Sequence, residues 1–156
     1  MSQETATDAA TEPRPPVQRD RALVLTVDDE PCIGRVVELK LRAGGLDVMR
    51  AASGEEGLEK FVEHRPDVLI TDVKMPGMSG IELCRRCEEY RGDWPFFVIV
   101  LTSQLDEATR EWLEQGDHRK YLSKPFSPRE ILRTVTDYLA RREPPKATGH
   151  DPGAST

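Results

Sequence analysis

The sequence lacks the features that mark secreted and membrane-spanning proteins. It has three cysteines in 156 residues, an odd number that cannot pair completely. Its longest apolar run, residues 96–101, is far shorter than the stretch of about 20 residues that crosses a bilayer. Residues 1–20 contain no apolar segment typical of a signal peptide. These absences predict a soluble protein of the reducing cytoplasm.

An excess of basic residues is also missing. The chain has 28 acidic and 22 basic residues, a net charge of -6, and its lysines and arginines form no stripe. We therefore expect no direct nucleic acid partner and no membrane partner. Neither a P-loop nor a GxGxxG motif follows any apolar run, which argues against a nucleotide-binding protein.

Composition divides the chain into a central domain and two tails. Residues 1–20 and 143–156 are poor in large apolar side chains, so they cannot bury enough surface to offset the entropy of ordering. We predict that both tails are disordered. Residues 21–142 are predicted to form one compact domain, and no internal repeat is visible in them.

Within that domain, short apolar runs alternate with segments of helical period. Residues 23–27 are apolar except for Thr26, which is typical of a strand covered on both faces. A helix follows over residues 31–43, where apolar positions that include Val36 recur every three or four residues. Further strands are predicted at residues 48–51, 68–71, 96–101 and 121–122. Four further helices are predicted: one that begins at Ser53, one at residues 80–90, one that carries the apolar stripe Leu105, Ala108 and Trp112, and one that begins at Ser127.

Five strands alternating with five helices predict an α/β fold, a doubly wound five-stranded parallel sheet. Right-handed crossovers place helices on both faces of such a sheet, and ligands bind beyond the carboxyl ends of its strands. The apolar runs end in polar side chains at Asp28, Asp29, Asp72, Thr102 and Lys124. Because parallel strands all end at one edge, we expect these five side chains to meet there.

This mixture of side chains indicates a metal-assisted phosphoryl site. Three neighbouring carboxylates repel one another unless a cation lies between them, and oxygen ligands beside a phosphate favour Mg2+. Lys124 would pair with phosphate oxygens, and Thr102 would donate a hydrogen bond to them. Each residue alone has an ordinary role, as a helix cap, turn residue or solvated charge. Their coincidence at four strand ends makes that explanation of the whole set improbable.

The segments VDDEP, TDVKMPGMSG, VLTS and YLSKPF closely resemble the signature of response-regulator receiver domains, of the stand-alone CheY-like type, across residues 21–142. The resemblance implies a flavodoxin-like sheet with strand order 2-1-3-4-5. It further implies that Asp72 is the phosphoacceptor, that Asp29, supported by Asp28, binds Mg2+, and that the backbone carbonyl of Lys74 completes the protein ligands.

Two further roles follow from the resemblance. Thr102 and Tyr121 would form the switch pair, and Lys124 would contact the phosphoryl group through a cis bond to Pro125. The chain would then be a single-domain response regulator that takes a phosphoryl group from a phosphohistidine of a sensor kinase or phosphotransfer protein. It would catalyse this transfer and its own dephosphorylation, without turning over a separate substrate as a conventional enzyme does.

The expected output is a change in the surface formed by the fourth helix, fifth strand and fifth helix, read by a downstream protein effector. We expect a monomer or a phosphorylation-dependent dimer. Two alternatives stay open: a receiver-like binding module that works without phosphorylation, and a receiver fragment of a longer protein. A phosphatase of the haloacid-dehalogenase type is disfavoured because Lys74 stands where a second acid is needed. Cys84 and Cys87 fall inside a predicted helix, where core packing explains them best.

Overall fold

The computed structural model describes residues 19–92 and 94–141, so the predictions for the tails fall almost entirely outside the described residues. All five strands are parallel and lie in the order β2-β1-β3-β4-β5, which confirms the predicted fold. The elements follow one another as β1 (Leu23–Val27), α2 (Pro31–Ala43), β2 (Asp47–Ala51), α3 (Gly54–His64), β3 (Val68–Asp72), α4 (Gly80–Tyr90), β4 (Phe97–Thr102), α5 (Glu107–Glu114), β5 (Arg119–Ser123) and α6 (Pro128–Arg141).

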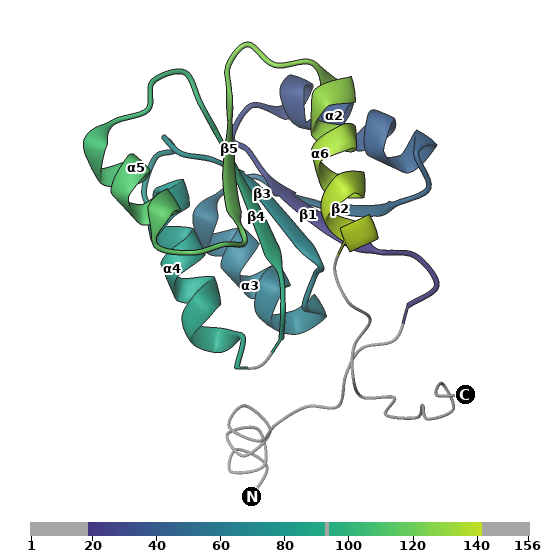
Figure 1. The fold of residues 1–156 in the computed structure, drawn as a ribbon, viewed down its shortest axis with the longest axis horizontal. Helices are drawn as coiled ribbons and strands as arrows, with labels where there is room; N and C mark the ends of the chain where they lie inside the picture. Colours follow the sequence, from purple (N-terminus) through teal and green to yellow (C-terminus); the bar gives the residue numbers. More distant parts are fainter. Residues whose placement is uncertain (1–18, 93, 142–156) are drawn as a thin grey trace, which may run out of the picture. The chain divides into compact units, whose positions relative to one another are not determined.

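Helices cover the two faces of the sheet unequally. Helices α2 and α6 lie on one face, and α3, α4 and α5 lie on the other (Figure 1). Successive strand residues point to opposite faces, so Leu69 joins the core under α3 to α5 while Ile70 joins the core under α2 and α6. Burial on both faces explains why the central strands are continuously apolar.

Helix starts depend on the capping residues that the sequence indicates. The hydroxyl of Ser53 accepts a hydrogen bond from the Glu56 backbone N–H at 3.1 Å, and the hydroxyl of Ser127 accepts one from Glu130 at 3.1 Å. Each bond satisfies a backbone donor that the first helical turn leaves unpaired. These two predicted helix starts are confirmed.

The packed faces of two helices differ from the prediction. In α5 the carboxylate of Asp106 accepts from the Thr109 backbone N–H at 2.8 Å, so the helix begins after Leu105. Trp112 is buried as predicted, but this start turns Thr109 inward and leaves Ala108 exposed. In α2 the side chain of Val36 is 51% exposed and does not belong to the core. Cys84 and Cys87 of α4 are buried, as predicted.

The register of the sheet brings the polar strand ends to one edge. Asp72, the last residue of β3, lies beside Leu101 of β4, and Thr102 lies beside Ser123 of β5. Gly80 at the start of α4 packs directly on this edge. A Cβ atom at position 80 would lie 2.0 Å from the backbone oxygen of Asp72, so any larger side chain would push the helix away from β3.

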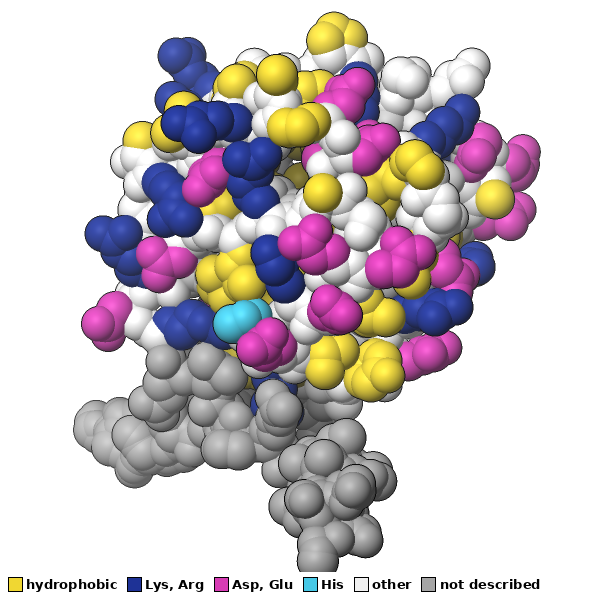
Figure 2. Space-filling view, turned by 180° about the vertical axis from the view of Figure 1, so that it is seen from behind, with side chains coloured by type: hydrophobic (Ala, Val, Ile, Leu, Met, Phe, Trp, Pro, Cys, Tyr) yellow, Lys and Arg dark blue, Asp and Glu magenta, His cyan; other side chains and the backbone are white. Residues whose placement is uncertain are grey.

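The surface carries both signs of charge. Basic, acidic and apolar side chains alternate over the face turned away from the view of Figure 1 (Figure 2). Among residues 19–92 and 94–141, every helix is too short or too polar to span a bilayer.

Candidate functional site

Three carboxylates converge at the carboxyl edge of the sheet. Asp28 and Asp29 follow β1, Asp72 ends β3, and one oxygen from each lies within 4.8 Å of the other two. Asp72 is buried, Asp28 is half-buried and Asp29 is exposed, so the cluster forms a cup open to solvent on one side. The predicted meeting of these three side chains is found in the structure.

Asp28 makes the cluster receptive to a cation. Its Oδ1 accepts a 2.7 Å hydrogen bond from the Glu30 backbone N–H. Its Oδ2 is buried and has no hydrogen-bond partner among the described residues. Burial raises the pKa of Asp28, and the charge of Asp72 adds to this effect against the opposing Glu30 hydrogen bond. A hard divalent ion such as Mg2+ fits this all-oxygen set, because it would supply the partner that Oδ2 lacks.

Lys124 provides the basic group of the site. Its Nζ lies 2.8 Å from Oδ1 of Asp72, and its side chain is 24% exposed. Burial alone would lower the pKa of Lys124, but the hydrogen bond and charge of Asp72, with the charge of Asp28, raise it. The ammonium group is therefore charged at neutral pH. The peptide bond between Lys124 and Pro125 is cis, as the resemblance implies.

Thr102 ends β4 next to this site and is 5% exposed. Its hydroxyl donates to the backbone oxygen of Gln104 at 2.8 Å and accepts from the Gln104 backbone N–H at 3.2 Å. The hydroxyl thus holds the loop after β4 in this structure, a contact that the sequence pattern did not suggest. Tyr121 lies on β5 with 40% of its surface exposed. Lys74 is exposed in the loop after β3.

The three carboxylates and Lys124 thus lie together at the carboxyl edge of the sheet, and Thr102 lies at the end of the neighbouring strand β4. Residues 24–136 match the response regulator receiver domain family. The chain belongs to this family. Gly80, which the sequence analysis did not single out, now has a clear role in this receiver domain. It lets α4 begin against the backbone of Asp72, and its position in the MPGMSG segment is the signal that could have revealed it.

Several relatives resemble this receiver domain. The alkaline phosphatase synthesis transcriptional regulatory protein PhoP of Bacillus subtilis is 36% identical over 121 residues, which are 77% of this chain and 49% of PhoP. The chain thus spans about half the length of the curated relatives it matches.

Solved structures show the same fold. The chemotaxis protein CheY4 of Vibrio cholerae is 32% identical with a TM-score of 0.65, and the match covers 75% of this chain and 98% of CheY4. The response regulator DrrB of Thermotoga maritima, an OmpR/PhoB homolog, is 30% identical with a TM-score of 0.68, and the match covers 78% of this chain and 54% of DrrB.

Proposed function

We propose that this receiver domain accepts a phosphoryl group on Asp72 from a phosphohistidine of a sensor kinase or phosphotransfer protein, in a reaction that depends on Mg2+. The observation that carries the proposal is the position of Asp72. Its carboxylate is buried at a strand end, 2.8 Å from the ammonium of Lys124 and within 4.8 Å of Asp28 and Asp29.

The chemistry follows from these positions. An oxygen of Asp72 attacks the phosphorus in line, the bond from phosphorus to the imidazole nitrogen of the partner breaks, and the imidazole leaves. Lys124 pairs with a phosphoryl oxygen and offsets its negative charge. Asp28, Asp29 and the carbonyl of Lys74 would hold Mg2+, which supplies further positive charge to the phosphoryl oxygens. Hydrolysis of the acyl phosphate by water then returns the domain to its starting state.

The output depends on Thr102. Before phosphorylation its hydroxyl is bonded to the backbone of Gln104. A phosphoryl group on Asp72 offers a stronger, charged acceptor, so the hydroxyl would leave Gln104 and release the loop. The ring of Tyr121, now outward, would move into the space that Thr102 vacates. The surface formed by α5, β5 and α6 would change as a result, whether a separate effector or a further domain reads it.

Phosphate uptake can be tested by intact-protein mass spectrometry after incubation with Mg2+ and a small acyl phosphate. Wild type should gain one phosphoryl group and Asp72→Asn none. Asp137→Asn, on the exposed side of α6, is the matched control and should react like wild type. An adduct in Asp72→Asn, or no adduct in wild type, would contradict the proposal and favour a binding module that works without phosphorylation.

Lys124→Ala separates uptake from output. We expect the variant to accept phosphate more slowly, because Asp72 remains, but to lose the change in α5 and β5 that wild type shows. Hydrogen exchange of these elements, measured before and after phosphorylation, reports the change. If phosphorylated Lys124→Ala shows the full wild-type change, Lys124 has no part in transmission.

A further inference from the structure

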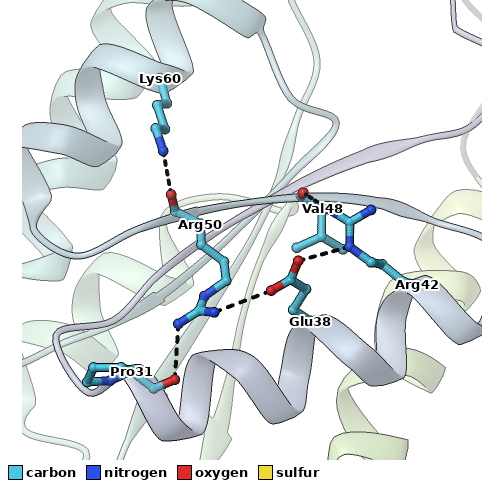
Figure 3. Close-up of polar contacts among 6 residues, drawn as sticks. All are labelled: Pro31, Glu38, Arg42, Val48, Arg50 and Lys60. Atoms are coloured by element: carbon cyan, nitrogen blue, oxygen red, sulfur yellow. Dashed lines mark hydrogen bonds and ion pairs between the residues drawn. The ribbon is translucent and has the colours of Figure 1, made fainter.

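Arg50, on the edge strand β2, reaches across the first turn of α2. Its Nη2 donates to the backbone oxygen of Pro31 at 3.0 Å, and its Nη1 donates to Oε1 of Glu38 at 3.3 Å. Glu38 in turn accepts from Arg42 at 2.9 Å (Figure 3). The fork of Arg50 therefore joins β2 to the residue that begins α2 and to the middle of the same helix.

The helix makes room for this fork at Gly34. A Cβ atom at position 34 would lie 3.2 Å from both Nε and Nη2 of Arg50, tighter than most side-chain contacts. Glycine inside a helix is unfavourable compared with alanine. Its presence in the buried face of α2 is explained by the guanidinium group that lies over it.

Helix α2 depends on such outside contacts because it lacks a side-chain cap of its own. Its N-cap residue, Glu30, makes no capping hydrogen bond among the described residues, whereas α3, α4 and α5 have Ser53, Ser79 and Asp106 in this role. The Glu30 backbone N–H is satisfied by Asp28, a member of the acid cluster. The start of α2 and the acid cluster are thus one structural unit.

The last two residues of β2, Arg50 and Ala51, hold the loop of Asp28 and Asp29 on both sides. The Asp28 backbone N–H donates to the backbone oxygen of Ala51 at 3.1 Å, and Arg50 binds Pro31 on the other side of Asp29. The strand end is itself fixed, since Lys60 of α3 donates to the backbone oxygen of Arg50 at 2.6 Å. Asp28 and Asp29 lie in a short loop whose two ends are both attached to one strand.

We propose that Arg50 is a positioning residue for the Mg2+ site. It fixes Pro31, and this contact prevents the loop of Asp28 and Asp29 from moving away from Asp72. Carboxylates that repel one another move apart in the absence of metal unless the backbone restrains them. A restrained loop binds the ion with less loss of conformational freedom. This inference rests on the proposed function, because it assumes that the acid cluster binds Mg2+.

The test is an NMR titration of backbone amides with magnesium chloride, which gives a Kd for each variant. Arg50→Met should bind Mg2+ about tenfold more weakly than wild type, as is typical when a residue that supports metal ligands is removed. Arg50→Lys should be similarly weakened, since it keeps the charge but loses the fork. Arg42→Met is the matched control: it removes another partner of Glu38 without touching Pro31 and should bind nearly as wild type.

A second measurement needs no metal. In Mg2+-free protein, amide hydrogen exchange at residues 28–30 should be faster in Arg50→Met than in wild type, and unchanged in Arg42→Met. Gly34→Leu is an independent test of the same contact. The leucine side chain would displace the guanidinium of Arg50, whereas leucine itself favours helix more than glycine does. It should weaken Mg2+ binding in the same direction.

The possible results separate the two proposals. Wild-type Mg2+ affinity or wild-type exchange in Arg50→Met, or equal weakening in Arg42→Met, would overturn the positioning role. Wild-type affinity in Arg50→Lys would show that charge alone matters and would overturn it too. The metal site itself is checked by Asp29→Asn. If that variant binds Mg2+ like wild type, the proposed function fails at the metal site, independently of Arg50.

Discussion

Two partly buried clusters of charge lie at opposite edges of the sheet. At the carboxyl edge, the ammonium of Lys124 lies 2.8 Å from Oδ1 of Asp72, while Asp28 interacts with it only through its charge. At the amino edge, both carboxylate oxygens of Glu88 accept from Nη2 of Arg119 at 2.9 Å. The guanidinium of Arg119 also lies 4.3 Å from the centroid of the Trp112 ring and donates to the Trp112 backbone oxygen.

The electrostatic outcome differs between the two clusters. Burial alone would raise the pKa of Glu88, but its contacts with His118 and Arg119 outweigh burial and lower it. The pKa of Asp28 is raised instead, because burial and the charge of Asp72 outweigh its hydrogen bond from Glu30. A cluster whose charges are matched acts as a structural clamp between α4, α5 and β5. A cluster with excess negative charge suits a cation, as the proposed Mg2+ site requires.

The largest expected difference between the clusters is their response to Mg2+. At a concentration of about 100 times Kd, Mg2+ should stabilise wild type by about 2.7 kcal/mol. Urea unfolding with and without Mg2+ measures this gain. Asp29→Asn should lose it, and Glu88→Gln should keep it although its starting stability is lower. A full gain in Asp29→Asn would show that the ion binds elsewhere.

The next largest effect is the loss of the structural clamp. Arg119→Met should reduce the free energy of unfolding by about 2 kcal/mol, because it leaves Glu88 partly buried without its bidentate partner. Phosphate uptake at Asp72 should be unaffected. Arg86→Met is the control: Arg86 pairs with Glu82 on an exposed helix surface, where solvent screens the salt bridge and its loss should change the stability little. Equal losses in the two variants would mean that Arg119 stabilises no more than a surface pair.

Asp28→Asn should have a smaller effect of opposite sign. Removing one of the repelling charges should raise the stability of Mg2+-free protein at neutral pH by about 1 kcal/mol. Urea unfolding in the presence of a chelator is the measurement, with Asp137→Asn as the surface control. A loss of stability in Asp28→Asn would show that charge repulsion does not dominate at this position, since the asparagine Oδ1 can still accept from the Glu30 backbone N–H.

The smallest effect is the pH dependence of the clamp. Because folding lowers the pKa of Glu88 below its ordinary value of 4.5, the stability it contributes is present above that value. It is lost as the pH falls through the lower folded pKa. The stability difference between wild type and Glu88→Gln should therefore be full at pH 7 and should shrink in acid. A difference that stays constant down to acidic pH would mean that Glu88 acts by packing alone.

The sequence was sufficient to predict the features that depend on local pattern. Continuous apolar runs located the strands, and their polar ends located Asp72 and Lys124, because parallel strands must all end at one edge. In the predicted stripe of α5, Trp112 is buried but Ala108 is exposed and Leu105 lies before the helix, since the capping bond of Asp106 decides which residue begins it. Val36 is exposed because it faces away from the sheet, although its spacing suits a buried position.

Contacts between distant elements could not be predicted. Arg50 binds Pro31 across 19 positions and Arg119 binds Glu88 across 31. Each contact depends on how a helix lies beside a strand, which periodicity does not specify. Arg50 also depends on Gly34, whose absent side chain makes sense only when the guanidinium is seen above it. Residues that join distant elements, such as Arg50 and Arg119, are therefore harder to find from the sequence than the polar residues that end the strands.

The proposed function requires that the acyl phosphate form on Asp72 itself. Borohydride reduces an aspartyl phosphate to homoserine, and peptide mass spectrometry then identifies the position. After incubation with Mg2+ and a small acyl phosphate, we expect homoserine at position 72. Homoserine at position 28 or 29, or phosphorylated protein with no homoserine at all, would contradict it.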